Sequence, residues 1–467
     1  MLARCPVLDW AASGGMALTG QPDGWPVASP APAFALLTAA VAELAAVTGE
    51  TGGPVRVDPG ELVAGRAALA GFVRRGRVSA GGSTRLLRAA DGWCAVSLSR
   101  AEDVTAVPAI VGALGLDGAD GAPGGSAEAA WEVLAGAAVR RPAAAVAGAA
   151  QLLGVPAGAL PGVLAGDLPG ARAGAEWPPG RASRIAAPSA AARLAGAVVV
   201  DLSSMWAGPL CSRLLGLAGA DVIKVETPYR PDGARAGDRR FFEWLHAGQR
   251  SMALDFRAGA GRDALAALLA AADVVIEASR PRALAQLGLA PELVPHRDGQ
   301  VWLSITGHGR GGPAADLVAF GDDAAVAGGL VGWADDGPVF CADAIADPLT
   351  GLCGALAVAR SVAAGGGELI DLALRDVAAC FAAAPAVDHG PHEVLRLRNG
   401  DRAGDGDGGS DADADFVVTC ARLGREQAVR APAFCGADGG ADGADGVAAE
   451  MGADTAAVLA WLGGGAR

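Results

Sequence analysis

Apolar runs typical of buried strands alternate with helical patterns through the middle of the chain. The runs are short and rich in Val and Ile, and they occur at 198–202, 221–226, 274–278 and 301–306. Such runs predict strands covered on both faces, and the segments between them carry the apolar spacing of helices. A long apolar helix follows Asp347, and the strand-like sequence LIDLAL comes after it. This alternation predicts an α/β fold with a doubly wound, mostly parallel, Rossmann-like sheet over 191–385.

A second, smaller α+β domain is predicted before the sheet domain, at 61–190. Within it, RLLRAADGWCAVSLS (85–99) predicts two strands joined by an Asp-Gly turn, and helical periodicity follows at 127–146. A run rich in Pro, Gly and Arg at 168–188 predicts a linker between the two domains.

Residues 1–60 resemble a later part of the same chain. The segment PVASPAPAFALLTAA (26–40) aligns without a gap with PVFCADAIADPLTGL (338–352), and both follow a Gly-rich apolar stretch. In this alignment Ala35 takes the place of Asp347. We interpret 1–60 as a degenerate partial repeat of the sheet-domain segment, although two Ala-rich helices can also look alike by composition alone.

The last part of the chain, 386–467, combines an acidic tract rich in Asp, Gly and Ala with a helical tail. The tract lacks the Asp spacing and the closing Glu of a calcium-binding loop, which favours a solvated, disordered segment. His389 and His392 lie in a Pro/Gly loop before the tract, and we expect no chemical role for them.

Charge and cysteine content exclude several kinds of partner. The net charge of −14 argues against nucleic acid, because phosphate binding needs a basic face. We find no membrane-length run free of Gly, Pro and charge, and the N-terminal MLARCPVLDW has no signal-peptide core. The eight cysteines form no CxxC pair, which predicts reduced thiols in a cytoplasmic protein and no metal site.

The turn after the first predicted strand of the sheet suits a phosphate but not a dinucleotide. No GxGxxG follows VVVDL; the turn is SSMWAGP, with Gly208 as its only glycine. A nicotinamide or flavin cofactor is therefore not expected. The free backbone N–H groups at the start of the following helix still suit a phosphate or pyrophosphate.

Five stretches of the sheet domain carry more specific information. They are DLSSMWAGPLCSRLLGLAGADVIKVE (201–226), HAGQRSMALDF (246–256), ADVVIEASRPRALAQLGL (272–289), VWLSITGHGRGGP (301–313) and AIADPLTGLCGALAVA (344–359). In this order, and with the tail MGADTAAVLAWLG (451–463), they resemble family III CoA-transferases. That group includes formyl-CoA transferases, carnitine CoA-transferases and α-methylacyl-CoA racemases. RLLRAADGW and GVPAG resemble the family's smaller domain, which normally follows the sheet domain, so the domain order is rearranged here.

The resemblance implies a covalent mechanism centred on Asp347. The matching aspartate attacks an acyl-CoA thioester and forms a mixed anhydride; the released CoA thiolate returns to the aspartyl carbonyl, and an incoming carboxylic acid then takes over the CoA. Backbone N–H groups would stabilise the oxyanion. A Gly-rich loop would cover the site, and residues 80–83 are the nearest candidate. From its local sequence alone, Asp347 is also an ordinary cap of the helix that follows it.

The resemblance also implies contacts to coenzyme A. They lie in the first turn, near the second strand and after the fourth, at Trp206, Ala207, Gly208, Arg250, Leu254, Arg257, Ser279 and Arg280. Arginine suits the 3′-phosphate and pyrophosphate, because its guanidinium can donate two parallel hydrogen bonds. Ala278 and Ser279 stand where the family usually has Asn-Phe, and Thr227 stands where a basic residue is frequent.

The sequence therefore predicts a CoA-transferase that moves CoA from an acyl-CoA donor to a carboxylic acid, as a cytoplasmic homodimer or with a different partner subunit. A non-catalytic CoA-binding scaffold is the alternative, favoured by the missing Asn-Phe and the rearranged order. An acyl-CoA racemase is disfavoured, because alignment puts Phe320 where that branch needs a histidine, and phenylalanine cannot exchange a proton.

Overall fold

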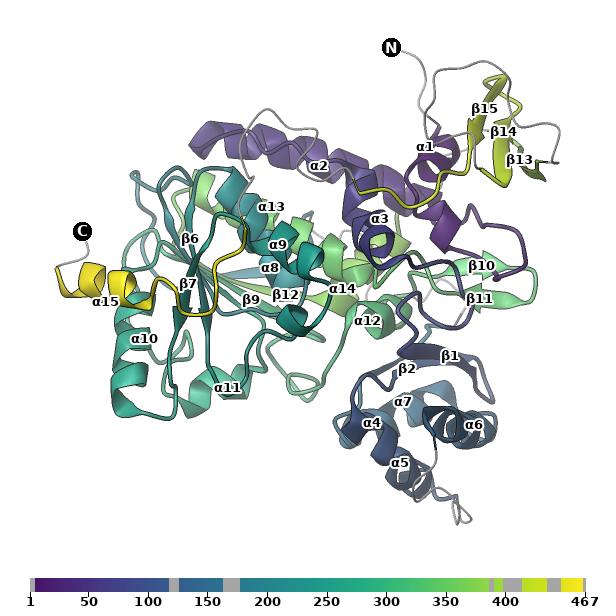
Figure 1. Ribbon diagram of the computed structural model, residues 1–467, viewed down its shortest axis with the longest axis horizontal. Helices are drawn as coiled ribbons and strands as arrows, with labels where there is room; N and C mark the ends of the chain where they lie inside the picture. The colour runs from purple at the N-terminus through teal and green to yellow at the C-terminus, as the bar shows by residue number, and fades with distance from the viewer. Residues whose placement is uncertain are drawn as a thin grey trace.

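The computed structural model describes residues 5–116, 126–162, 177–385, 390–397, 414–434 and 447–464 (Figure 1). Its centre is a seven-stranded sheet in the order β4-β12-β9-β8-β5-β6-β7, parallel throughout except for β4 at one edge. The strands are β4 (Arg181–Arg184), β5 (Val198–Asp201), β6 (Asp221–Glu226), β7 (Arg250–Ala253), β8 (Val274–Glu277), β9 (Val301–Thr306) and β12 (Glu368–Ala373). The predicted α/β fold with a mostly parallel sheet is confirmed.

Helices cover both faces of this sheet, as the continuous apolar strands predict. Val199 of β5 belongs to one hydrophobic core and its neighbour Val200 to another. The first core includes α8 (Ala207–Leu217) and α13 (Ala346–Ala363), and the second includes α10 (Gly259–Ala271) and α15 (Thr455–Gly463). Shorter elements of the domain are η2 (Gly233–Ala236), α9 (Arg239–His246), α11 (Pro281–Gln286) and α14 (Leu374–Ala382).

The strand order reverses between β5 and β8. From β5 the sheet continues through β6 and β7 on one side, and through β8, β9 and β12 on the other. In doubly wound sheets, ligands bind outside the carboxyl ends of the strands at such a reversal. The fold therefore favours a ligand site at the turns that follow β5 and β8.

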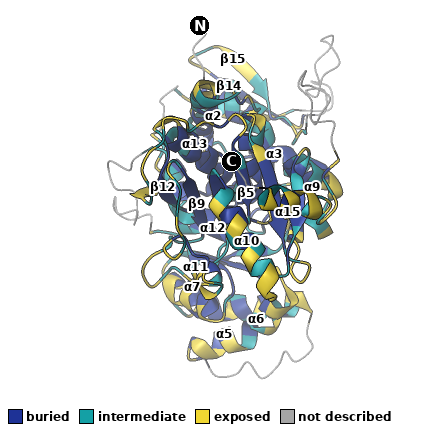
Figure 2. Cartoon of the chain, turned by 90° about the vertical axis from the view of Figure 1, so that its left-hand side faces the viewer, coloured by how far each residue is buried: buried dark blue, intermediate teal, exposed yellow. Residues whose placement is uncertain are grey.

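The smaller domain has a hydrophobic core of its own and a three-stranded antiparallel sheet. Its elements are β1 (Thr84–Arg88), β2 (Trp93–Ser97), α4 (Ala101–Thr105), α5 (Val107–Ala113), α6 (Ala127–Ala138), α7 (Ala143–Leu152) and β3 (Ala157–Ala159). β1 and β2 form the predicted hairpin. α12 (Gly321–Ala327) of the sheet domain packs on β2 and β3, so the two domains meet at the start of α12. Figure 2 shows α5 and α6 with exposed outer faces at the far end of this domain.

The N-terminal segment has the same order of elements as the region around α13. It runs through α1 (Pro6–Ala12), η1 (Met16–Leu18), a bridge between Gly20 and Pro26, α2 (Ala31–Thr51) and α3 (Pro59–Ala70). In the sheet domain α12, the hairpin of β10 (Gly332–Ala334) and β11 (Gly337–Val339), and α13 follow in that order. This parallel supports our proposal that 1–60 is a degenerate repeat; the domain boundaries also stay proposals.

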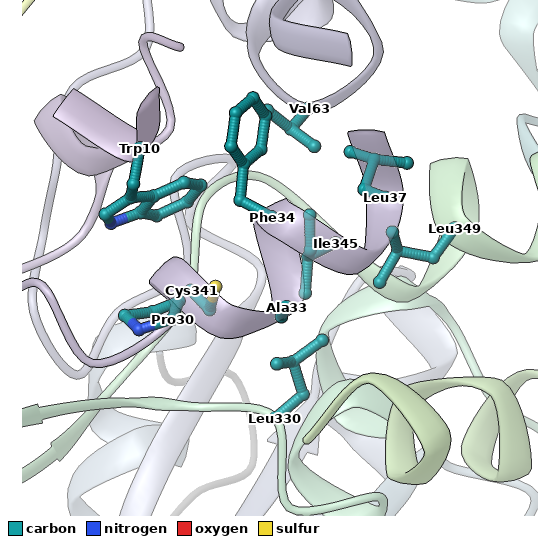
Figure 3. Close-up of a pocket in the computed structure, with 10 residues that line it drawn as sticks. All are labelled: Trp10, Pro30, Ala33, Phe34, Leu37, Val63, Leu330, Cys341, Ile345 and Leu349. Carbon is teal, nitrogen blue, oxygen red and sulfur yellow. The ribbon is translucent and has the colours of Figure 1, made fainter. Parts of the chain in front are cut away.

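α2 and α13 pack against each other along the top of the sheet domain (Figure 1). By length and composition α2 could cross a membrane, but its Leu37 and Leu44 are buried in the core that contains α13. Figure 3 shows a small apolar pocket at this seam, with Ile345 and Leu349 of the α13 side in its wall. A helix turns about 100° per residue, so these two side chains, each two positions from Asp347, point away from that carboxylate. The pocket is a packing feature and not a substrate site.

Two expectations about irregular segments are wrong. Residues 181–184 fall in the predicted linker but form β4. Within the predicted disordered tract, β14 (Phe416–Cys420) and β15 (Arg425–Ala428) join β13 (His392–Arg396) in a small sheet that packs against α1. Alternate residues of β14 are buried, a pattern that the composition of the whole tract conceals. Residues 398–413 and 435–446 of the tract, and His389, lie outside the described residues.

Candidate active site

Asp347 lies in the first turn of α13, where the helix dipole favours a negative charge. One turn later, α13 touches the start of α8 so closely that a Cβ on Gly351 would lie 2.7 Å from the carbonyl oxygen of Ala207. This approach puts Asp347 beside the turn that follows β5. The residue as a whole is half-buried.

Two further carboxylates and one guanidinium accompany Asp347. Asp343 precedes α13, and Asp322 lies in the first turn of α12. Arg66 of α3 pairs with Asp343 at 3.3 Å, and its charge favours the ionised form of all three carboxyls. Gly321 leaves no room beside the carboxylate of Asp347, because a Cβ there would lie 2.6 Å from its Oδ2 and 2.2 Å from the carbonyl oxygen of Ala344.

Burial raises the pKa of each of these carboxyls. It raises the pKa of Asp347 to about 7 and that of Asp343 to about 6, and it raises the pKa of Asp322 as well. Repulsion from neighbouring carboxylates adds to the effect on Asp343 and Asp347, and Arg66 opposes it. A side chain whose pKa lies close to the working pH is typical of functional sites.

Strained backbone marks the same two segments. Among the residues that the structure describes, only three other than glycine have a positive φ: Met205 (75°) in the turn after β5, and Ala342 (51°) and Ala344 (42°) just before α13. Each N–H donates to a side-chain oxygen 2.9 to 3.1 Å away, which belongs to Asp232, Thr19 and Asp322 respectively. Costly backbone conformations that the surroundings enforce are typical of functional sites.

A buried ion-pair network holds the turn after β5. Lys224, the only lysine of the chain, pairs with Asp232 at 2.8 Å and donates to the carbonyl oxygen of Ser203. Burial lowers the pKa of Lys224, but attraction by Asp201 and Asp232 outweighs burial and leaves the pKa above its usual value. The network therefore fixes the backbone on which the predicted CoA contacts begin.

The Gly-rich loop predicted at 80–83 lies over the carboxylates. The hydroxyls of Ser79 and Thr84, which flank the loop, lie close enough to Asp322 to oppose the rise of its pKa. A Cβ on Gly81 would lie 3.6 Å from the guanidinium of Arg66. The N-terminal part of the chain thus brings both Arg66 and this loop to the region of Asp347.

Five of the predicted CoA contacts lie together at the reversal of strand order. Trp206, Ala207 and Gly208 open α8 after β5, and Ser279 and Arg280 precede α11 after β8. The indole N–H of Trp206 is buried and has no hydrogen-bond partner among the described residues. The guanidinium of Arg66 stacks over the same ring, 5.0 Å from its centroid.

The other three predicted contacts differ in their placement. Leu254 and Arg257 follow β7 at the same edge, where Leu254 is buried and Arg257 is exposed and stacks on Tyr229. Arg250 lies at the amino end of β7, on the opposite edge of the sheet, where its Nε donates to Asp221 at 3.0 Å. The structure therefore separates Arg250 from the other predicted contacts.

A surplus of positive charge surrounds Arg280. Its pKa is lowered, first by burial and then by the charges of Arg282, Arg100 and Arg230, while Asp316 opposes them. Arg100 comes from the smaller domain and stacks over the ring of Phe320, 5.3 Å from its centroid. Since Phe320 directly precedes Gly321, this cationic group and the carboxylates meet at the start of α12.

A family model that matches slightly more than half of the chain identifies the family. The model of CoA-transferase family III matches residues 194–437. The chain belongs to CoA-transferase family III. Phe320, the N-cap of α12, has a side chain that cannot carry a proton.

Relatives within family III match the chain over less than half its length. The succinate–glutarate CoA-transferase of Agrobacterium fabrum is 34% identical over 207 residues, which cover 39% of this chain and 51% of that protein. The formyl-CoA:oxalate CoA-transferase of Afipia carboxidovorans is 31% identical over 198 residues, 39% of this chain and 46% of that protein. The chain spans about half the length of the curated relatives it matches. A CAIB/BAIF family protein from Brucella suis matches with 32% identity and a TM-score of 0.38, over 42% of this chain and 56% of that structure.

The sequence prediction missed three charged residues of the site. Asp322 and Asp343 carried a local signal, because both lie close to the motif that contains Asp347 in stretches with several aspartates. Arg66 carried none, since 277 residues separate it from Asp343 and nothing in the helix around it differs from a solvated basic residue.

Proposed function

We propose that this protein transfers CoA from an acyl-CoA donor to a carboxylic acid, with Asp347 as the covalent nucleophile. One observation carries the proposal: a half-buried aspartate with a raised pKa stands at the start of α13, beside the turn after β5 where the fold favours a ligand. Family membership supports the same reaction class. The particular donor and acceptor are left to experiment.

The proposed reaction alternates between anhydride and thioester intermediates on Asp347. A carboxylate oxygen of Asp347 attacks the thioester carbonyl, the C–S bond breaks, and CoA leaves as a thiolate while an aspartyl mixed anhydride forms. The thiolate then attacks the aspartyl carbonyl, which releases the donor acid and leaves CoA on Asp347. An acceptor carboxylate attacks this thioester to form a second anhydride, and the thiolate finally attacks the acceptor carbonyl, so that acceptor-CoA leaves and Asp347 is restored.

The surroundings of Asp347 suit the two ends of such a substrate. The charges around Arg280 would bind the phosphates of coenzyme A, since they lie by the turn after β8. The unpartnered indole N–H of Trp206 would donate to an oxygen of the same substrate. The strained backbone before α13 would hold Asp347 in place, and the loop at 80–83 would supply N–H groups to the developing oxyanion.

A trapping experiment tests the proposal directly. The purified protein is mixed with a panel of acyl-CoAs, treated with hydroxylamine and analysed by intact-mass and peptide mass spectrometry. A hydroxamate at Asp347, absent from Asp347→Ala, is the expected result. If no donor gives an adduct although CoA binds, the chain is a non-catalytic CoA-binding homologue, as its Ala278-Ser279 in place of Asn-Phe would then suggest.

The predicted phosphate contacts can be tested with two arginines on opposite edges of the sheet. Arg280→Gln is expected to weaken CoA binding about tenfold or more, because a half-buried guanidinium by the ligand turn is lost. Arg250→Gln removes the same charge at the far edge and is expected to leave the affinity unchanged. Calorimetric titration with CoA measures both; equal losses would contradict a phosphate site at Arg280.

The quaternary structure is also a proposal. A homodimer is expected from the family resemblance, and a different partner subunit is the alternative because the N-terminal repeat has Ala35 where the second copy has Asp347. The chain's own N-terminal part already brings Arg66 and the loop at 80–83 to Asp347. A homodimer or monomer that is active alone would exclude an obligatory second subunit.

A further inference from the structure

Three side chains that bind metals in other proteins meet at the junction of α1 and the small sheet of β13–β15, at the upper right of Figure 1. The sulfur atoms of Cys5 and Cys420 and an imidazole nitrogen of His392 all lie within 4.8 Å of one another. Sγ of Cys5 is 3.0 Å from Nε2 of His392. Among the described residues, this is the one group of three or more Cys, His, Asp or Glu side chains with such spacing.

The fold brings the three together from three elements. His392 and Cys420 are direct partners in the antiparallel pairing of β13 with β14, so their side chains stand on the same face of the hairpin. Cys5 is the N-cap residue of α1, and α1 packs on β14. The Cys5 side chain makes no capping hydrogen bond. It is directed instead toward the two residues of the hairpin.

The chemistry of this set is that of a zinc site. Zinc binds thiolate sulfur and imidazole nitrogen, usually in a tetrahedral arrangement. The two negative charges of the thiolates would balance the two positive charges of a divalent cation, and the imidazole is neutral. The complex would therefore have no net charge in its apolar surroundings. The surroundings of the two cysteines are apolar, because Cys5 is 2% exposed and Cys420 is 1% exposed in the same core as Phe416 and Val418.

The observed spacing needs only small movements to accept the ion. Bond lengths of about 2.3 Å to sulfur and about 2.1 Å to nitrogen at tetrahedral angles put neighbouring ligand atoms roughly 3.6 to 3.8 Å apart. The contact between Cys5 and His392 at 3.0 Å would open slightly, and no pair of ligand atoms in the group exceeds 4.8 Å. Rotations of the three side chains can open the short contact and shorten the longer separations.

We propose that Cys5, His392 and Cys420 bind one zinc ion, which fastens the N-terminal helix to the small C-terminal sheet. The two thiols release their protons when the ion binds, and a water molecule would fill the fourth position. The ion is structural, since it lies by α1 and the small sheet and not by α13. It would add a metal crosslink to the apolar contacts that α1 already makes with β14.

The sequence pattern could not show this site. Zinc sites are recognised in a sequence by ligand pairs such as CxxC, and no CxxC pair exists here. Cys5 and His392 are 387 residues apart, and the sequence placed His392, which begins β13, in a loop without a chemical role. The absence of CxxC therefore excluded only the local kind of zinc site, and the expectation of no metal rested on that alone.

Metal analysis of the full chain, purified with zinc supplied and excess zinc removed, tests the proposal. About one zinc per chain is expected in the wild type and in Cys380→Ser, a control that removes a thiol from α14. Cys5→Ser and Cys420→Ser are expected to retain about tenfold less or lower. A zinc-free wild type, or equal zinc in all four proteins, would overturn the proposal.

Cobalt substitution decides the matter even if the serine variants fail to fold. The wild-type chain loaded with Co²⁺ is expected to show intense visible bands of tetrahedral coordination and a thiolate-to-cobalt absorption in the near ultraviolet. If the protein sample shows only the spectrum of hydrated cobalt, the site is contradicted. A non-reduced mass that reveals a bond between Cys5 and Cys420 would also overturn it, because those sulfurs would then be a disulfide.

Discussion

Asp347→Asn is expected to lower kcat for CoA transfer by at least about a thousandfold, because the amide cannot form the acyl anhydride. Asparagine has nearly the same volume as aspartate and keeps a carbonyl oxygen beside Gly321. The variant should therefore fold and bind CoA. Asp263→Asn, an exposed position on α10, removes the same charge and should retain full activity. Retained transfer in Asp347→Asn would contradict covalent catalysis by this residue.

The same substitution is expected to stabilise the protein near neutral pH. Burial raises the pKa of Asp347 from an ordinary 3.8 to about 7, so between these values the folded chain holds a proton that the unfolded chain has lost. Stability therefore falls as pH rises from about 4 to 7, and the deficit is complete above pH 7. Asp347→Asn lacks this contribution, although Asp322 and Asp343 keep theirs.

Thermal unfolding between pH 4 and pH 8 measures this effect. We expect Asp347→Asn to melt at a higher temperature than the wild type at pH 7 and to differ little from it at pH 4. Asp263→Asn should follow the wild type across the range. A variant that melts at a lower temperature at pH 7 would mean that the carboxylate stabilises the fold, contrary to its burial among like charges.

The sheet domain could be predicted from the sequence because its determinants are local. Each buried strand is a continuous apolar run, and β6 and β9 have the predicted bounds. Asp347 and the turn around Gly208 lie inside motifs whose residues are consecutive. The edge strand β4 could not be found this way, because its four residues are exposed and it gains its place only by pairing with β12.

Contacts between segments far apart in the sequence explain which site residues the sequence analysis missed or misplaced. Arg66 acquires its surroundings mainly from Asp343 and Trp206, neither of which is near it in the chain. Arg250 was predicted as a CoA contact because its motif matched. The structure places it at the start of β7, so its side chain lies at the amino edge of the sheet, away from the other contacts. A motif names residue types, and only the topology decides at which edge they stand.

Arg66 is the residue through which the N-terminal segment would act on the nucleophile, and Arg66→Gln is expected to alter the pH dependence of transfer. If ionised Asp347 attacks, kcat/KM rises as pH passes through the pKa of about 7. Arg66 lowers that pKa, so its removal raises the pKa and moves the rise to higher pH. At pH 6 we expect a loss of about tenfold, which shrinks as the pH increases.

The shape of the profile separates this role from simple packing. Arg66 also stacks on Phe72, Trp206 and Phe241, and loss of those contacts would lower activity equally at every pH. Arg66→Lys keeps the charge but not the planar stacking, and should restore most of the wild-type profile. Arg56→Gln, at an exposed position, should leave it unchanged. A pH-independent loss in Arg66→Gln that lysine does not rescue would show that Arg66 serves packing, and that the N-terminal segment does not control the ionisation of Asp347.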